Sequence, residues 1–267
     1  MGWQDVVPSE DVDVADWIRH RLHGFAEDVG SVIPSGFTAY ARIFHPAVRL
    51  RVAAEDPEVE LRWSDVAAVY GKTVHPEMQF HTIVGHALFA PQVELAGFYE
   101  PREGVLSLSQ SAALVQRLAR HTSTPNECWF CLWDGYGDLH PGSIRTLTSH
   151  YVGTGLPRLF RILALKLRPY REPPRRFPSQ VRRVKLPERE YFMFKGSVAQ
   201  AAGWDEGPNL WWPEDRAWCV ASEIDFPYTY VGGSQDLIDE IVHHSAIEAL
   251  PSALDHGITA DSDKINS

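Results

Sequence analysis

The chain lacks the features that most directly indicate a cellular location. Its 267 residues include only three cysteines, and an odd number spread through a long chain is not the disulfide framework of a small secreted domain. No stretch approaches the roughly 20 consecutive apolar residues of a membrane span, and the acidic start MGWQDVVPSEDVDV does not resemble a signal peptide. We therefore expect a soluble, cytoplasmic protein with reduced cysteines.

Complete catalytic and metal-binding motifs are also missing. The sequence contains no GxSxG nucleophile elbow, no HExxH motif and no P-loop. Cys128 and Cys131 form a CxxC pair in an apparent strand, where side chains three apart point to opposite faces, so we interpret both as structural. His75, His81 and His86 cluster without the spacing that places three ligands on one helix face. We expect no catalytic residue, no metal site and no cofactor; a metal held by two of these histidines and a distant carboxylate stays an alternative.

Basic residues are scarce outside one segment. Residues 1–150 carry 11 basic and 19 acidic side chains (−8), residues 151–196 carry 12 and 3 (+9), and residues 197–267 carry 2 and 13 (−11). We favour the interpretation that the basic segment lies across the acidic surface of its own fold; the alternative is a patch for phosphate or anionic lipid. Because the acidic regions would repel a polyanion, we expect no nucleic-acid partner.

Apolar periodicity predicts an α+β fold, with a mixed, mainly antiparallel sheet flanked by four or five helices. Helical spacing predicts helices at 13–29, at 65–70 with Ser64 as the cap and Gly71 as the end, from Ser107 or Ser109 onward, and after Ser234. Alternation predicts strands at 37–45 and 128–133, a further strand within 80–90, and a hairpin of 210–212 and 217–224. The helix and strand on either side of residue 124 are also compatible with half of a parallel unit.

One segment does not have the composition of a core. Residues 156–168 could form an amphipathic helix, and the following RPYREPPRRFPSQVRRVKLP contains five prolines among basic residues. Since proline lacks the N–H that a sheet interior needs, we interpret this stretch as a linker or large surface loop. We predict a single α+β domain over 1–267, interrupted by a basic, proline- and arginine-rich loop or insertion at about 156–189. Membrane contact through the 156–168 helix is a weaker hypothesis.

Two aromatic, turn-rich blocks contain five of the nine tryptophans. They are CWFCLWDGYG at 128–137 and PNLWWPEDRAWCVASEIDFPYTYVGGS at 208–234. Indoles beside Asp, Asn, Glu and Arg suit a ligand with an apolar face and a polar rim, and Trp and Arg dominate protein interfaces. The binding residues that we predict on this basis are Trp133, Asp134, Tyr136, Trp211, Trp212, Glu214, Asp215 and Arg216.

Four stretches of the sequence resemble a family of bacterial proteins common in genomes of high GC content. They are SVIPSGFTAYARIFHPA, HTSTPNECWFCLWDGYG, PNLWWPEDRAWCVASEIDFPYTYVGGSQDLIDEI and DHGITADSDKIN. This resemblance covers most of the chain apart from the basic segment, and it implies no activity and no catalytic residue. The pattern WWPE…W…E followed by a helix is similar to SUKH-type toxin-immunity proteins, which are α+β binding modules. Their early Trp-Gly-Leu-Pro signal is missing here.

Two hypotheses about function follow. The first is a non-enzymatic, cytoplasmic binding protein that recognises another protein through an acidic, Trp-containing surface and is immunity-like in the sense of the resemblance. The second is an enzyme acting on a small polar ligand in an aromatic cleft. Its candidate polar groups would have to converge in one pocket with displaced pKa values. They are Asp134, His140, Glu214, Asp215 and Arg216.

Overall fold

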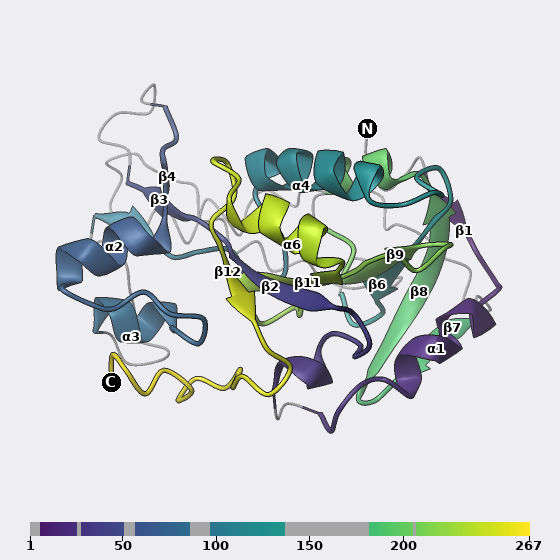
Figure 1. Ribbon diagram of the computed structural model, residues 1–267, viewed down its shortest axis with the longest axis horizontal. Coiled ribbons are helices and arrows are strands. Elements are labelled where there is room, and N and C mark those ends of the chain that lie inside the picture. The colour runs from purple at the N-terminus through teal and green to yellow at the C-terminus, as the bar shows by residue number, and fades with distance from the viewer. Residues whose placement is uncertain (1–5, 26–27, 51–56, 86–96, 137–181, 205–206) are drawn as a thin grey trace, which may run out of the picture.

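The computed structural model describes residues 6–25, 28–50, 57–85, 97–136, 182–204 and 207–267 (Figure 1). In these ranges one large sheet is built from β1 (Val7–Pro8), β2 (Ala39–Phe44), β6 (Cys128–Trp133), β7 (Arg183–Leu186), β8 (Arg189–Gly196), β9 (Leu210–Pro213), β10 (Cys219–Ala221), β11 (Tyr228–Gly233) and β12 (Ala249–Ser252). The nine strands run in the order β1-β8-β6-β9-β10-β11-β2-β12, with β7 also paired to β8. Every pairing is antiparallel.

A second sheet and several helices complete the described fold. The second sheet has the order β4-β3-β5 and consists of β3 (Ala47–Arg49), β4 (Glu60–Leu61) and β5 (Phe98–Tyr99). The α-helices are α1 (Asp16–Arg19), α2 (Trp63–Tyr70), α3 (Phe80–Val84), α4 (Leu108–Arg120) and α6 (Gln235–Val242). The 3-10 helices are η2 (Asp13–Ala15), η3 (Val29–Ser31) and η5 (Val198–Gly203). The α+β class is confirmed.

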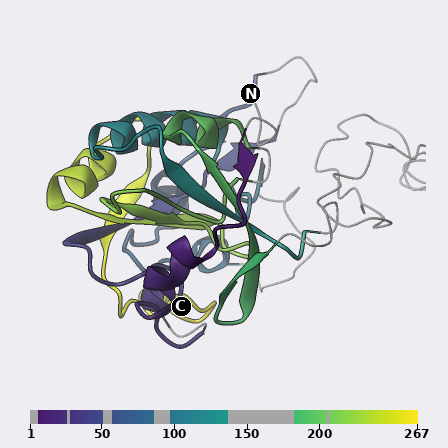
Figure 2. The same cartoon turned by 90° about the vertical axis from the view of Figure 1, so that its right-hand side faces the viewer.

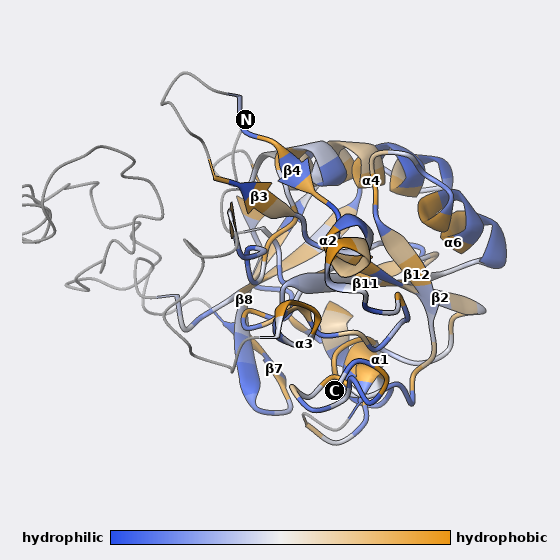
Figure 3. Ribbon diagram, turned by 90° about the vertical axis from the view of Figure 1, so that its left-hand side faces the viewer, coloured by the Kyte–Doolittle hydropathy of each residue, from blue (hydrophilic) through white to orange (hydrophobic). Residues whose placement is uncertain are grey.

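The helices form layers on both sides of the large sheet. α4, η5 and α6 lie over one face, and α1 with the segment after β12 lies against the other (Figures 1 and 2). α2, α3 and the small sheet lie beside β12 and β2, and Figure 3 views the molecule from their side, with apolar stretches in the strands between the layers. None of the helices in the described ranges has the length and apolar character that crossing a membrane requires.

Strand residues alternate between two hydrophobic clusters, one on each face of the large sheet. Phe44 of β2 and Cys131 of β6 belong to the cluster on the α1 side, whereas Ile43 and Cys128 belong to the cluster under α4 and α6. The predicted strands at 37–45 and 128–133 are therefore confirmed, and the CxxC thiols point to opposite faces as expected. All three cysteines of the chain are free and buried.

Local capping signals placed several helix ends correctly. The Ser107 hydroxyl accepts a hydrogen bond from the Gln110 N–H (3.3 Å) at the start of α4. The Ser234 hydroxyl likewise accepts from the Leu237 N–H (3.3 Å) at the start of α6. α2 ends at Gly71, whose φ of 64° is the left-handed conformation that glycine adopts without strain. The predicted hairpin is confirmed as the antiparallel pair β9 and β10.

The helix predicted over 13–29 is wrong in its extent. Only η2 and the single turn of α1 are helical, followed later by η3. The N–H of Arg21 donates to the carbonyl of Ile18 (2.8 Å), and the N–H of His23 donates to that of Gly30 (2.8 Å). These backbone groups therefore close a loop and do not continue a helical ladder. The apolar spacing in this segment marks the side of an irregular chain that packs on the sheet.

One further prediction is wrong, and one alternative is excluded, for different reasons. The strand expected within 80–90 is the helix α3, closed by Gly85 at a φ of 70°, and residues 86–90 lie outside the described ranges. A short apolar run does not by itself distinguish a buried strand from a buried helix. β6 is antiparallel to both neighbours, β8 and β9, so α4 and β6 are not half of a parallel unit.

The start of α2 is capped by a residue from another part of the chain. Ser64 is not the cap, because the helix already begins at Trp63. The Glu248 carboxylate, just before β12, accepts hydrogen bonds from the N–H groups of Trp63 (2.6 Å) and Ser64 (2.7 Å). A negative charge at this position interacts favourably with the helix dipole. The cap thus joins α2 to the edge of the large sheet.

The basic loop predicted at about 156–189 falls mostly outside the described residues, as does the helix predicted at 156–168. Its last part is not a loop. β7 and the first residue of β8 lie there, joined by a turn at Pro187 and Glu188. β7 pairs only with β8 in the described sheet, so a basic strand is accommodated at an edge.

Candidate functional site

The two tryptophans of the predicted recognition hairpin lie in the core. Trp211 is 3% exposed and Trp212 is 1% exposed. They are neighbours in β9, so their rings lie on opposite faces of the sheet: Trp211 packs under α4 and Trp212 packs on the α1 side. Trp212 meets the ring of Trp17 edge-on, with centroids 5.9 Å apart. Their predicted place on an exposed surface is wrong, because both faces of the sheet are covered.

The charged turn after these tryptophans ties elements of the fold together. Glu214 accepts a hydrogen bond from the indole N–H of Trp129 (2.5 Å). Asp215 accepts from the hydroxyls of Thr122 (2.8 Å) and Ser123 (2.7 Å) and from the Ser123 N–H (2.7 Å). Partial burial acts to raise the pKa of Asp215, but these hydrogen bonds outweigh it and hold the pKa below its usual value. The turn is therefore anchored to the loop between α4 and β6.

The predicted binding residues are divided between the two ends of β6. Arg216 lies in the hairpin turn, with its guanidinium 5.4 Å from the ring of Trp17. At the opposite end, Asp134 forms an ion pair with Arg183 (3.0 Å). His140 lies outside the described residues. The enzyme hypothesis required its polar groups to converge in one pocket. The four that are described do not do so; they are Asp134, Glu214, Asp215 and Arg216.

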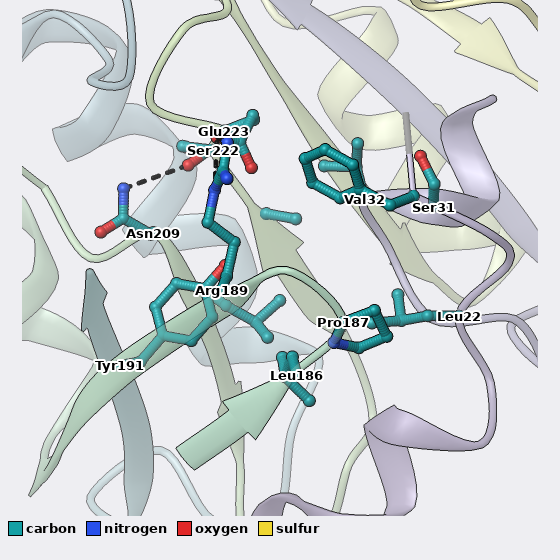
Figure 4. A pocket seen from close by; sticks show the side chains of 13 residues that line it. Leu22, Ser31, Val32, Leu186, Pro187, Arg189, Tyr191, Asn209, Ser222 and Glu223 are labelled. Carbon is teal, nitrogen blue, oxygen red and sulfur yellow. Dashed lines mark hydrogen bonds and ion pairs between the residues drawn. The ribbon is translucent and has the colours of Figure 1, made fainter. Parts of the chain in front are cut away.

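A cleft opens next to the Trp133 end of β6, and we name it the Arg189 cleft. It is small and open to solvent, with an enclosed volume of about 30 Å³. Figure 4 shows apolar side chains on one side and the Arg189 and Glu223 pair with Asn209 on the other. The lining residues are Leu22, Phe25, Ser31, Val32, Leu186, Pro187, Arg189, Tyr191, Asn209, Leu210, Ala221, Ser222 and Glu223.

Arg189 and Glu223 form the charged centre of the cleft. The Nε and one terminal nitrogen of Arg189 donate to the same oxygen of Glu223 at 3.3 and 3.1 Å, and their side chains are only 20% and 15% exposed. The guanidinium also lies 5.0 Å from the ring of Phe25 and 5.8 Å from that of Trp133. Phe25 is 44% exposed, so this aromatic group is accessible to a partner. Cation–π contact and the ion pair together fix the orientation of Arg189.

Asn209 organises the polar wall of the cleft. Its side-chain oxygen accepts the Trp133 N–H (2.8 Å), and its amide nitrogen donates to the Tyr136 hydroxyl (3.0 Å) and the Ser222 carbonyl (3.3 Å). The rings of Trp133 and Tyr136 meet edge-on, 5.4 Å apart. Burial, reinforced by Glu223, raises the pKa of Tyr191 well above its usual value. Trp133 and Tyr136, two of the predicted binding residues, thus support the rim of the cleft without lining it.

A buried chain of hydrogen bonds runs from Ser222 into the core. The Ser222 and Thr229 hydroxyls are 2.7 Å apart, Thr229 is 2.8 Å from Nε2 of His45, and Nδ1 of His45 is 2.6 Å from the carbonyl of Arg102. A carbonyl only accepts, so Nδ1 carries the proton and Thr229 donates to Nε2. Ser222 then donates to Thr229. Burial lowers the pKa of His45 to about 4, which makes this imidazole a weak base.

The histidine cluster of the sequence is separated by the fold. His75 is buried and its Nε2 is 2.8 Å from Oδ1 of Asp263, in a network with Gln79 and Asn266 that holds the segment after β12 against the loop between α2 and α3. His81 lies in α3, and His86 lies outside the described residues. Within the described ranges, no three His, Cys, Asp or Glu side chains are grouped as metal ligands.

Comparison of the chain with models of protein families, with curated proteins and with solved structures found no match. The geometry of the Arg189 cleft is therefore the basis on which a function can be assigned. Sequence reasoning missed its central residues because they come from three distant segments, β8, the start of β9 and the end of β10. The only signal for Glu223 was its place in the second aromatic block, and Arg189 was assigned to the basic loop.

Proposed function

We propose that the protein is a non-enzymatic binding protein that recognises a segment of another protein in the Arg189 cleft. The observation that carries this proposal is the half-buried Arg189–Glu223 pair beneath the exposed ring of Phe25, facing an apolar wall that includes Leu22 and Val32. Aromatic and arginine side chains next to apolar pockets are the groups that contribute most to protein interfaces. The side chains are already oriented by intramolecular contacts, so little ordering is needed on binding.

The charges at the rim indicate the chemistry of the partner. Asp225 lies 3.9 Å from the Arg189 guanidinium and adds a second carboxylate beside Glu223. These two carboxylates exceed the one cation that they flank, so we propose that the partner presents an apolar side chain next to a basic one. The acidic recognition surface that we propose is therefore this cleft, and not the hairpin that the sequence led us to expect.

The buried thiols support a reducing compartment as the place where this binding occurs. All three are unpaired and lie in the core, as is usual in cytoplasmic proteins. The hairpin resembles SUKH-type toxin-immunity proteins, and this resemblance favours an immunity-like role in which the partner is a toxin.

A photo-crosslinking experiment tests the proposal. A benzophenone amino acid replaces Phe25, which is 44% exposed at the cleft, and in a control it replaces Leu108, which is 75% exposed at the start of α4 on the other face of the sheet. We expect a discrete protein adduct from position 25 in native cells, absent from position 108 and weakened by Glu223→Gln. Identical adducts from both positions, or an adduct unaffected by Glu223→Gln in a variant of unchanged melting temperature, would refute recognition in the cleft.

A further inference from the structure

Arg42 is a fully buried cation in β2, the strand next to the edge strand β12 of the large sheet. Its relative exposure is 0%, and its strand, β2, lies between β11 and β12. One terminal nitrogen donates to the carbonyl of Pro76 (2.5 Å). Its Nε and its other terminal nitrogen have no hydrogen-bond partner in the part of the chain that the structure describes. A guanidinium in such a place normally has each N–H satisfied, and it usually has a counter-charge.

A second unpaired donor lies directly beside Arg42. Tyr230 is its register partner in the antiparallel pair of β11 and β2, so both side chains stand on the same face of the sheet. Tyr230 is 1% exposed, and its hydroxyl has no hydrogen-bond partner among the described residues. Arg42 and Tyr230 therefore present three donor groups without a hydrogen-bond partner among the described residues: the Nε and one terminal nitrogen of Arg42, and the hydroxyl of Tyr230.

The neighbouring groups do not neutralise the charge of Arg42. The guanidinium carbon lies 3.6 Å from the ring centroid of Tyr228 and 5.0 Å from that of Phe44, which supplies cation–π attraction but no counter-charge. No carboxylate of the described residues comes within ion-pair distance of it. A nearby carboxylate is that of Glu77, which lies next to Pro76, acts on Tyr230 electrostatically without an ion pair to Arg42, and accepts a hydrogen bond from the Gly257 N–H (2.7 Å).

Asp263, the buried carboxylate of the segment after β12, is also committed elsewhere. Its two oxygens accept hydrogen bonds from His75, from the N–H of Gln79 and from Asn266. Its oxygens are therefore occupied, and neither of them pairs with Arg42.

We infer that Arg42 and Tyr230 form a binding site for a single small monovalent anion of halide size. An arginine has only donors, so the ligand must accept hydrogen bonds, which excludes a metal cation. One negative charge matches the single positive charge of a guanidinium that has no ion-pair partner among the described residues. Both side chains are enclosed by the core, so the ligand is limited to a few ångströms in size. This site is independent of the Arg189 cleft and stands or falls separately from the proposed function.

Thermal unfolding in chloride tests this site. Chloride is exchanged for gluconate at constant ionic strength, so that charge screening stays the same. We expect the melting temperature of the native protein to rise saturably with chloride, by about 5–10 °C at a concentration 100 times its Kd. Tyr230→Phe removes one donor and is expected to reduce this rise. Tyr228→Phe is the matched control, since it removes a hydroxyl that donates to the Ile258 carbonyl (3.0 Å) and leaves the ring on Arg42.

Diffraction from crystals of the native protein grown in bromide gives a second measurement that does not depend on a folded variant. We expect an anomalous peak between the Arg42 guanidinium and the Tyr230 hydroxyl. The inference is overturned if the density there is that of water only, or if the melting temperature does not distinguish chloride from gluconate.

Discussion

Replacing Asp263 by asparagine measures how strongly one carboxylate holds the segment after β12 to the loop between α2 and α3. The Asp263 side chain is 0% exposed. One oxygen accepts from His75 (2.8 Å) and the Asn266 N–H (2.9 Å), and the other accepts from the Gln79 N–H (3.1 Å) and the Asn266 amide (3.1 Å). Asparagine is nearly isosteric but keeps only one accepting oxygen, so it leaves two buried donors facing its own NH₂ group.

The cost follows from those two donors. Leaving a buried donor unsatisfied costs about 1–3 kcal/mol, so two such donors lower the free energy of unfolding of Asp263→Asn by about 2–6 kcal/mol. For a chain of this size that corresponds to roughly 4–24 °C in melting temperature. Asp261→Asn is the matched control, because that carboxylate lies on the same segment, is largely exposed and bonds only Thr259 and Lys264. Asp261→Asn should leave the melting temperature nearly unchanged.

The pH dependence gives an independent check on Asp263. Burial acts to raise its pKa, but hydrogen bonds from Asn266 and Gln79 outweigh burial and hold the pKa below its usual value. Its contribution to stability is therefore fully present above the unfolded pKa of about 3.9 and is lost as pH falls through the folded value. The difference between wild type and Asp263→Asn should accordingly shrink below about pH 4. Equal melting temperatures at pH 7, with unchanged amide exchange at Gln79 and Asn266, would show the reasoning to be wrong.

Three further predictions concern packing, backbone strain and thiol reactivity. Trp212→Ala should lower the free energy of unfolding in urea by about 3–5 kcal/mol, because the ring is 1% exposed; a loss below about 1 kcal/mol would contradict its core position. Glu188→Asn should stabilise the protein by up to about 1 kcal/mol, since residue 188 has a φ of 58° that asparagine tolerates better; a lower melting temperature would argue against strain. Burial raises the pKa of Cys128 to about 12, so a thiol reagent at pH 8 should label no cysteine until the protein unfolds; rapid labelling of the native protein would contradict this.

Local signals were sufficient to predict much of the sheet and several helix ends. The alternation in β2 and β6, the serine caps at Ser107 and Ser234, and the glycine that ends α2 each depend on neighbours within a few residues. The cap of α2 by Glu248 could not be predicted in this way, because it joins positions 185 residues apart. A propensity rule contains no information about such a contact.

The candidate site was only partly predictable for the same reason. Trp133 and Tyr136 do border the Arg189 cleft, because they lie at the end of β6, where Asn209 bonds both. The burial of Trp211 and Trp212 depends on whether helices cover both faces of β9, which their own sequence does not specify. Pairing of Arg189 with Glu223 requires β8, β9 and β10 to assemble in their observed order.

The position of β2 in the sheet has a consequence for synthesis of the protein. β2 is formed early in the chain, but its pairing partners follow much later, with Ala41 opposite Val231 and Ile43 opposite Ala249. While the ribosome adds the intervening roughly 190 residues, both edges of this apolar strand stay unpaired. Such a strand is prone to associate with other chains, and closing so large a loop slows folding. We therefore expect the nascent chain to depend on chaperones until β11 and β12 emerge.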